Sequence, residues 1–230
     1  VKKLTGSAVV TLKIFASDIN DAWFWDHESN FVITDPVKYY TGEEVTFSEE
    51  EIGIPKLADG TPLKSTDYEI DYANNTNAGT AQMFVIGKDS YENSIKNLTF
   101  EIKQTPISSV TVNDYVEWID TDDAEDYKDA LGLVVKAKVP GTNKELTLVE
   151  GTDYTVTYKF NGNNIAGQTV TAEITLKDNG NFCNDNKITV SDAATITKAT
   201  LKSEYIKFRE GTTFTYTGQA IEPAFDVVID

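Results

Sequence analysis

The feature that most constrains this chain is an internal repeat. The stretch TDYEIDYANNTNAGTAQMFVIG begins at Thr66, and a second version, TDYTVTYKFNGNNIAGQTVTAEITL, begins at Thr152. The Asp-Tyr pair at 67 and 68 returns 86 residues later, at 153 and 154, and the Ala-Gly pair at 78 and 79 returns 88 residues later, at 166 and 167. The chain is therefore built from a unit of about 90 residues that is used in series.

Alternating side chains predict a β-hairpin in each copy of the repeat. Tyr68, Ile70 and Tyr72 alternate with acidic residues, and the second copy alternates in the same way from Tyr154. A period of two with one apolar face is typical of a strand that lies on a core. A second apolar strand follows each Ala-Gly pair and ends in a glycine-containing turn, at Gly87 in the first copy. We therefore expect two such hairpins.

Composition favours strands and excludes some classes of partner. The 230 residues include 11 Tyr and 11 Phe but 6 Pro, which favours an all-β fold. The formal net charge of −17 repels phosphate backbones and anionic lipid headgroups, so we expect no nucleic acid partner. No apolar run is long enough to span a bilayer, so we expect no membrane insertion. The single cysteine, Cys183, cannot form an internal disulfide, which is more typical of bacterial than of animal secreted proteins.

The repeat interval divides the chain into four parts. Residues 1–15 contain TLKI, which matches TFEI 88 residues later, so they look like the closing strand of a preceding repeat or a capping strand. Residues 16–104 and 105–198 form two complete repeats. Residues 199–230 contain YTG at 216–218, which matches YTG at 40–42, so they look like the opening strands of a third repeat.

These motifs together resemble a known family. YTG, IEP, DYxVxY, an Asn-rich loop, AGTA, a GKDSY turn and TFEI resemble the tandem immunoglobulin-like repeats of Gram-positive bacterial cell-surface proteins. The resemblance implies two tandem immunoglobulin-like β-sandwiches, with partial repeats at both ends, in an extracellular protein on the bacterial surface. It also implies a structural or adhesive role without catalytic residues, so we expect no enzyme activity.

Tryptophans provide a candidate ligand site. Trp23, Trp25 and Trp118, with Asp26 beside them, offer flat aromatic faces and a carboxylate that suit a sugar. This predicts, as an alternative function, a carbohydrate-binding module for a polysaccharide or a host or cell-surface glycan. The same side chains also suit packing in a core or between domains, and the sequence leaves both interpretations open.

An acidic run provides a candidate metal site. Its oxygen ligands, which suit Ca²⁺, come from Asp120, Asp122, Asp123, Glu125 and Asp126. Glu125 stands where an EF-hand loop requires glycine, so the likeness to that motif is superficial. The alternative interpretation is a solvated loop without a cofactor.

The incomplete ends suggest a further alternative function. A sandwich that lacks strands exposes an unpaired edge, which another chain can complete. The chain would then be a fibre subunit that self-associates by strand complementation through its terminal strands.

Overall fold

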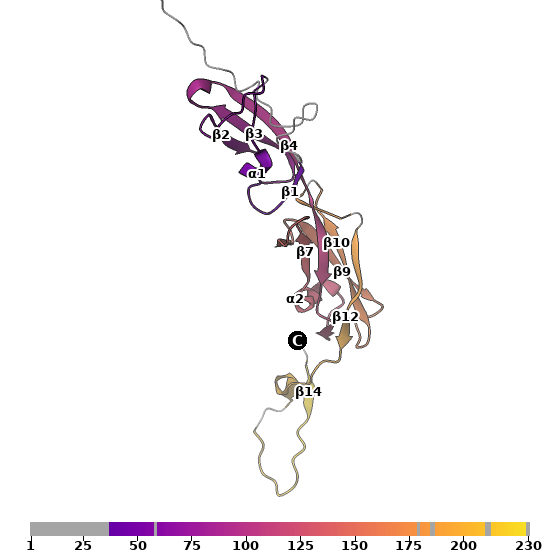
Figure 1. Ribbon diagram of the computed structural model, residues 1–230. Coiled ribbons are helices and arrows are strands. Elements are labelled where there is room, and N and C mark those ends of the chain that lie inside the picture. Colours follow the sequence, from indigo (N-terminus) through magenta and orange to yellow (C-terminus); the bar gives the residue numbers. More distant parts are fainter. Residues whose placement is uncertain (1–36, 58, 179, 185–186, 210–212, 229–230) are drawn as a thin grey trace, which may run out of the picture. The chain divides into compact units, whose positions relative to one another are not determined.

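The computed structural model describes residues 37–57, 59–178, 180–184, 187–209 and 213–228. The chain divides into two compact units, Val1–Gln104 and Thr105–Asp230, called here the first and the second unit. The described residues are mostly strands, with a few helices of three or four residues, which confirms the all-β prediction (Figure 1). The predicted strand at 1–15 and the candidate residues Trp23, Trp25 and Asp26 lie outside the described residues.

In the first unit, the described residues form one four-stranded sheet of order β1-β4-β3-β2. The strands are β1 Val37–Tyr39, β2 Tyr68–Ala73, β3 Gly79–Gly87 and β4 Ile95–Lys103. The predicted hairpin is β2 and β3, which pair antiparallel, and β4 pairs antiparallel with β3. The short strand β1 runs parallel to β4.

One face of this sheet carries the core of the first unit. Alternate residues of β3 and β4 are buried, among them Met83, Val85 and Phe100. The segment between β1 and β2 covers them with Val45, Phe47, Ile52 and Leu63. Within this segment, helix α1 Glu49–Ile52 begins with a capping box in which Ser48 and Glu51 bond to each other's backbone N–H groups.

The second unit contains a sheet of the same order, β6-β12-β10-β9. Its strands are β6 Tyr115–Glu117, β9 Tyr154–Asn161, β10 Thr169–Leu176 and β12 Ile188–Thr197. The predicted hairpin of the second copy is β9 and β10, which pair antiparallel. β6 runs parallel to β12, as β1 does to β4.

A second sheet of this unit has the order β11-β5-β7-β8. Its strands are β5 Thr105–Thr111, β7 Val134–Lys138, β8 Glu145–Thr147 and β11 Phe182–Cys183. Between β6 and β7 lie the 3₁₀ helix η3 Ala124–Tyr127 and the helix α2 Lys128–Leu131, which bury Ala124, Tyr127 and Leu131 in the core.

The C-terminal part of the second unit holds a two-stranded sheet of β13 Ile206–Phe208 and β14 Phe225–Val227. Three of its apolar side chains are exposed, Phe208 at 39%, Phe225 at 52% and Val227 at 48%. Within the described ranges, no helix has the length and apolar character needed to cross a membrane.

Candidate functional site

Trp118, the one described tryptophan of the predicted sugar site, is part of the core's edge. Its half-buried ring packs against the buried cluster of the second unit, and its indole N–H donates to the backbone carbonyl of Asn164 at 2.9 Å. A sugar-stacking tryptophan presents its open face to solvent, whereas this ring and its N–H already have partners in the fold. The position of Trp118 therefore favours packing over ligand binding.

The acidic run folds into a capped turn. Asp123 accepts from the backbone N–H of Glu125 at 3.0 Å, the Thr121 hydroxyl donates to Asp126, and Glu125 Oε1 accepts from the backbone N–H of Tyr158 at 2.8 Å. Asp120 and Asp122 are exposed. Among the described residues, no three carboxylate, histidine or cysteine side chains converge on one point. The structure thus brings these carboxylates to separate backbone and side-chain partners.

Asn164, which the sequence did not single out, organises this corner of the second unit. Its side-chain amide donates to the carbonyls of Ile119 at 2.8 Å and Thr121 at 2.6 Å. The Tyr127 hydroxyl donates to Asn164 Oδ1 at 2.8 Å and accepts from the backbone N–H of Ile119 at 3.1 Å. Together with the bond from Trp118, these contacts fix the segment after β6 to the loop between β9 and β10.

The first unit uses an asparagine in the corresponding loop. Asn75 is buried in the loop between β2 and β3. Its side-chain amide donates to the backbone carbonyl of Val45 at 3.1 Å, and its backbone carbonyl accepts from the backbone N–H of Val45 at 2.8 Å. Val45 lies in the segment after β1, as Ile119 lies in the segment after β6. In both units, the asparagine-rich loop thus ties down the chain that leaves the parallel edge strand.

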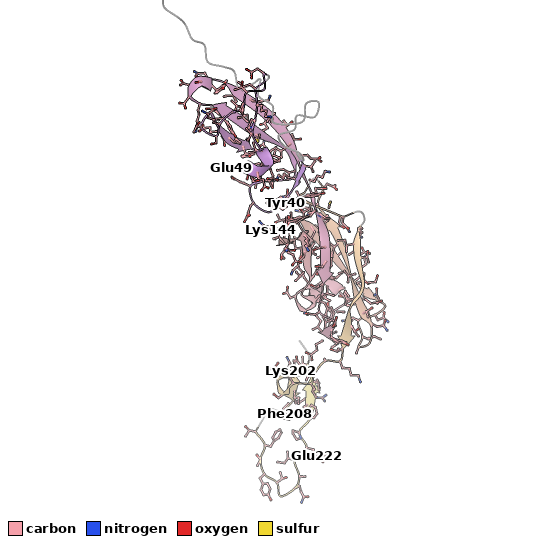
Figure 2. All side chains as sticks on the ribbon, viewed as in Figure 1. Tyr40, Glu49, Lys144, Lys202, Phe208 and Glu222 are labelled. Carbon is pink, nitrogen blue, oxygen red and sulfur yellow. The ribbon has the colours of Figure 1, made fainter. Side chains whose placement is uncertain are left out.

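The parallel strand pair ends in the same way in both units. The backbone N–H of Tyr40, labelled in Figure 2, donates to the Lys103 carbonyl at 2.9 Å just beyond β1. The backbone N–H of Trp118 donates to the Thr197 carbonyl at 3.0 Å just beyond β6. Tyr40 and Trp118 therefore occupy corresponding positions. This correspondence is not recognisable in the sequence, because the two side chains differ.

A groove of 780 Å³ lies beside β2 in the first unit. One wall is the edge strand, with Tyr68, Ile70 and Tyr72, and the other wall runs through 52–55 and 63–65. Burial, with smaller effects from nearby carboxylates, raises the pKa of the Tyr68 and Tyr72 phenols. The Tyr72 oxygen accepts from the Phe47 N–H at 3.0 Å, which holds the covering segment against β2.

Comparison with protein-family models, curated proteins and solved structures gave no match to this chain. The functional argument therefore rests on the chain's own residues and topology.

Proposed function

We propose that the chain is a load-bearing structural or adhesive repeat region of a bacterial cell-surface or secreted protein. In this proposal, residues 16–104 and 105–198 are two tandem immunoglobulin-like β-sandwiches that catalyse no reaction. Their task is to hold other modules at a distance from the cell or against a surface.

The observation that carries the proposal is the strand order that the two units share. Each has a short edge strand, β1 or β6, that runs parallel to the long strand near the end of the unit, β4 or β12. Two such sheets in one chain are what duplication of a single structural unit produces.

The parallel pair also suits a chain under tension. When a unit is pulled by its two ends, β6 is drawn one way along its axis and β12 the other way. The hydrogen bonds between them lie across the pull, so they are loaded together in shear rather than broken one at a time. The bonds from Thr195 N–H to the Asp114 carbonyl at 2.9 Å and from Trp118 N–H to the Thr197 carbonyl at 3.0 Å close this pair at its two ends.

End-to-end extension of single molecules tests the proposal. We expect two unfolding events, each lengthening the chain by roughly 20–30 nm, because an extended residue spans about 3.3–3.6 Å. Val116→Pro removes an N–H that the parallel ladder places toward β12 and should lower the force of one event. Tyr115→Pro, whose N–H points away from β12, controls for the proline ring, and Val116→Ala controls for the loss of the buried Val116 side chain. A single event, or a force that Val116→Pro lowers no more than these two controls do, would contradict the proposal.

A fibre subunit is a second candidate, favoured by the C-terminal hairpin. β13 pairs antiparallel with β14, as β5 pairs with β7 in the second unit. Val135 and Ala137 of β7 are buried, whereas Phe225 and Val227 of β14 are exposed. An exposed apolar hairpin of this kind suits completion by another chain. Phe225→Asp and deletion of residues 1–15 should each convert polymers to monomers in analytical ultracentrifugation, and an unchanged size distribution would rule this candidate out.

A further inference from the structure

The edge of β2 in the first unit has backbone groups that point out of the sheet. Hydrogen-bonded residue pairs alternate along an antiparallel ladder. The bond from Lys88 N–H to the Asp67 carbonyl, at 2.8 Å, shows that residues 67 and 88 form such a pair. By the register of the two strands, residues 69 and 86 form the next hydrogen-bonded pair, and residues 71 and 84 the one after it. The N–H and C=O groups of Ile70 therefore turn away from β3, and so does the N–H of Tyr72, which donates to the Asp71 carboxylate at 2.9 Å.

Ile70 and Tyr72 also line the 780 Å³ groove. Its apolar lining comes from both walls, with buried Phe47, Ile52 and Leu63 at the base. Ile54 stands at the rim with 64% of its surface exposed. A strand laid in this groove would bond to the backbone of Ile70 and place every second side chain on apolar surface.

The second unit closes the corresponding edge with its own residues. The register of β9 and β10 turns residues 154, 156 and 158 outward, since Lys177 N–H donates to the Asp153 carbonyl at 3.0 Å. Glu125 Oε1 accepts the N–H of Tyr158 at 2.8 Å, and Gly151 N–H donates to the Tyr154 carbonyl at 2.8 Å. In addition, the Tyr127 ring lies edge-on to the Phe160 ring, with 5.9 Å between the ring centroids. This contact packs η3 against β9. Edge strands that are covered in this way do not recruit a further strand.

The charges around the groove indicate the partner. Glu49, labelled in Figure 2, and Glu69 line it, against Lys64 as its one lining cation among the described residues. Glu50 and Glu51 follow Glu49 in the first turn of α1, and Asp71 lies on β2. Lys88 pairs with Glu69 at 2.8 Å, and Lys38 pairs with Glu51, but carboxylates still outnumber ammonium groups. Basic residues in a partner strand would complement this surface.

We propose that the groove beside β2 binds an extended, basic peptide strand of a partner protein, which adds to the sheet as a fifth strand next to β2. Alternate apolar side chains of the peptide fill the groove between Ile70 and Ile54, and its Lys or Arg side chains face Glu49 and Glu69. This inference goes beyond the proposed function, because a load-bearing repeat requires no bound peptide.

Fluorescence anisotropy with the intact chain tests the inference. The probe is a labelled peptide of about ten residues that alternates valine with threonine and carries lysine at both ends, and the comparison peptide carries glutamate in place of lysine. We expect the basic peptide to bind more tightly, and its affinity to fall as salt is added. Equal binding of both peptides, or no binding of either, would overturn the proposal.

Two variants locate the site. Ile70→Pro deletes an outward N–H that no ladder bond uses, so the sheet should persist while the peptide's affinity falls by about fivefold to tenfold or more. Val156→Pro makes the same change on β9, where we expect no loss of affinity. Undiminished binding to Ile70→Pro would place the peptide elsewhere and contradict the proposal.

Ile54→Lys keeps the test decisive if Ile70→Pro fails to fold. This rim substitution lies outside the core, and it should weaken the basic peptide by removing apolar surface and adding a like charge. Unchanged affinity in this variant would also contradict the proposal.

Analytical ultracentrifugation without peptide tests whether the groove binds a second copy of this chain or a different protein. Self-association that Ile70→Pro abolishes would show that another copy fills the groove, and the proposal of a separate basic partner would then be wrong.

Discussion

The Tyr127 hydroxyl donates a 2.8 Å hydrogen bond to Oδ1 of Asn164, and this contact joins the segment after β6 to the loop between β9 and β10. The two residues are 37 positions apart. Because Asn164 also donates to the carbonyls of Ile119 and Thr121, its side chain satisfies backbone groups that lie in no sheet.

Asn164→Ala should therefore lower the free energy of unfolding of the second unit by about 2–3 kcal/mol, because it leaves the two carbonyls and the Tyr127 hydroxyl without this partner. Asn163→Ala, at the neighbouring exposed position, should change it by less than about 0.5 kcal/mol. Urea denaturation monitored by circular dichroism measures both. Equal effects would show that the Asn164 contacts contribute little.

Trp118→Ala should destabilise the second unit by about 2–4 kcal/mol, since it removes a ring packed on the core and the indole N–H bond to Asn164. It should leave the protein's mobility in polysaccharide-containing gels unchanged. Affinity electrophoresis of both proteins, beside their thermal unfolding, checks this. Retardation of the wild type that Trp118→Ala abolishes while the fold persists would instead support a carbohydrate-binding module.

Glu125→Ala should open the edge of β9. The variant loses the carboxylate that accepts the Tyr158 N–H, and we expect a loss of about 1–2 kcal/mol in the stability of the second unit. Glu125→Gln keeps an acceptor oxygen and should lose less. Hydrogen exchange at the Tyr158 amide reports the change directly: faster exchange is expected in the alanine variant, and unchanged protection would contradict the role of Glu125.

Glu173 should titrate far below an ordinary glutamate. Hydrogen bonds from Lys187 and then Lys159, with Nζ to Oε2 distances of 2.7 and 2.9 Å, lower its pKa from 4.5 to about 2. A lowered folded-state pKa contributes stability that is present above pH 4.5 and is lost as the pH falls toward 2. NMR titration of the Glu173 side chain measures the pKa, and replacing both lysines with alanine should return it toward 4.5. A titration midpoint near 4.5 in the unchanged chain would contradict the pairing.

The sequence predicted the central hairpins because their residues carry the signal themselves. Tyr68, Ile70 and Tyr72 alternate with acids, and the glycine expected at the end of the second strand is Gly87, the last residue of β3. Asn74, in the predicted loop, has φ of 56°, the left-handed conformation that asparagine tolerates. The pairing of β1 with β4 and of β6 with β12 was beyond prediction, since β1 and β6 have three residues each and show no periodicity.

The candidate sites were harder to predict for a physical reason. An acidic run such as Asp120 to Asp126 has the composition of a calcium loop, yet its carboxylates can equally accept backbone N–H groups, as those of Asp123 and Glu125 do. Composition does not distinguish these uses, because the direction of each side chain decides between them. Asn164 went unnoticed for a related reason: an asparagine-rich loop is typical of a turn, and the partners of Asn164 lie more than 35 residues away along the chain.

Pulling the second unit in two directions tests the load-bearing account most directly. In a Cys183→Ser background, handles on cysteines introduced at Gln104 and Lys198 load β6 against β12 in shear, and handles at Thr152 and Asp178 unzip β9 from β10 at the open end of their hairpin. The account predicts a clearly higher unfolding force for the first pair of handles than for the second. Equal forces, or a lower force along the 104 to 198 direction, would contradict it.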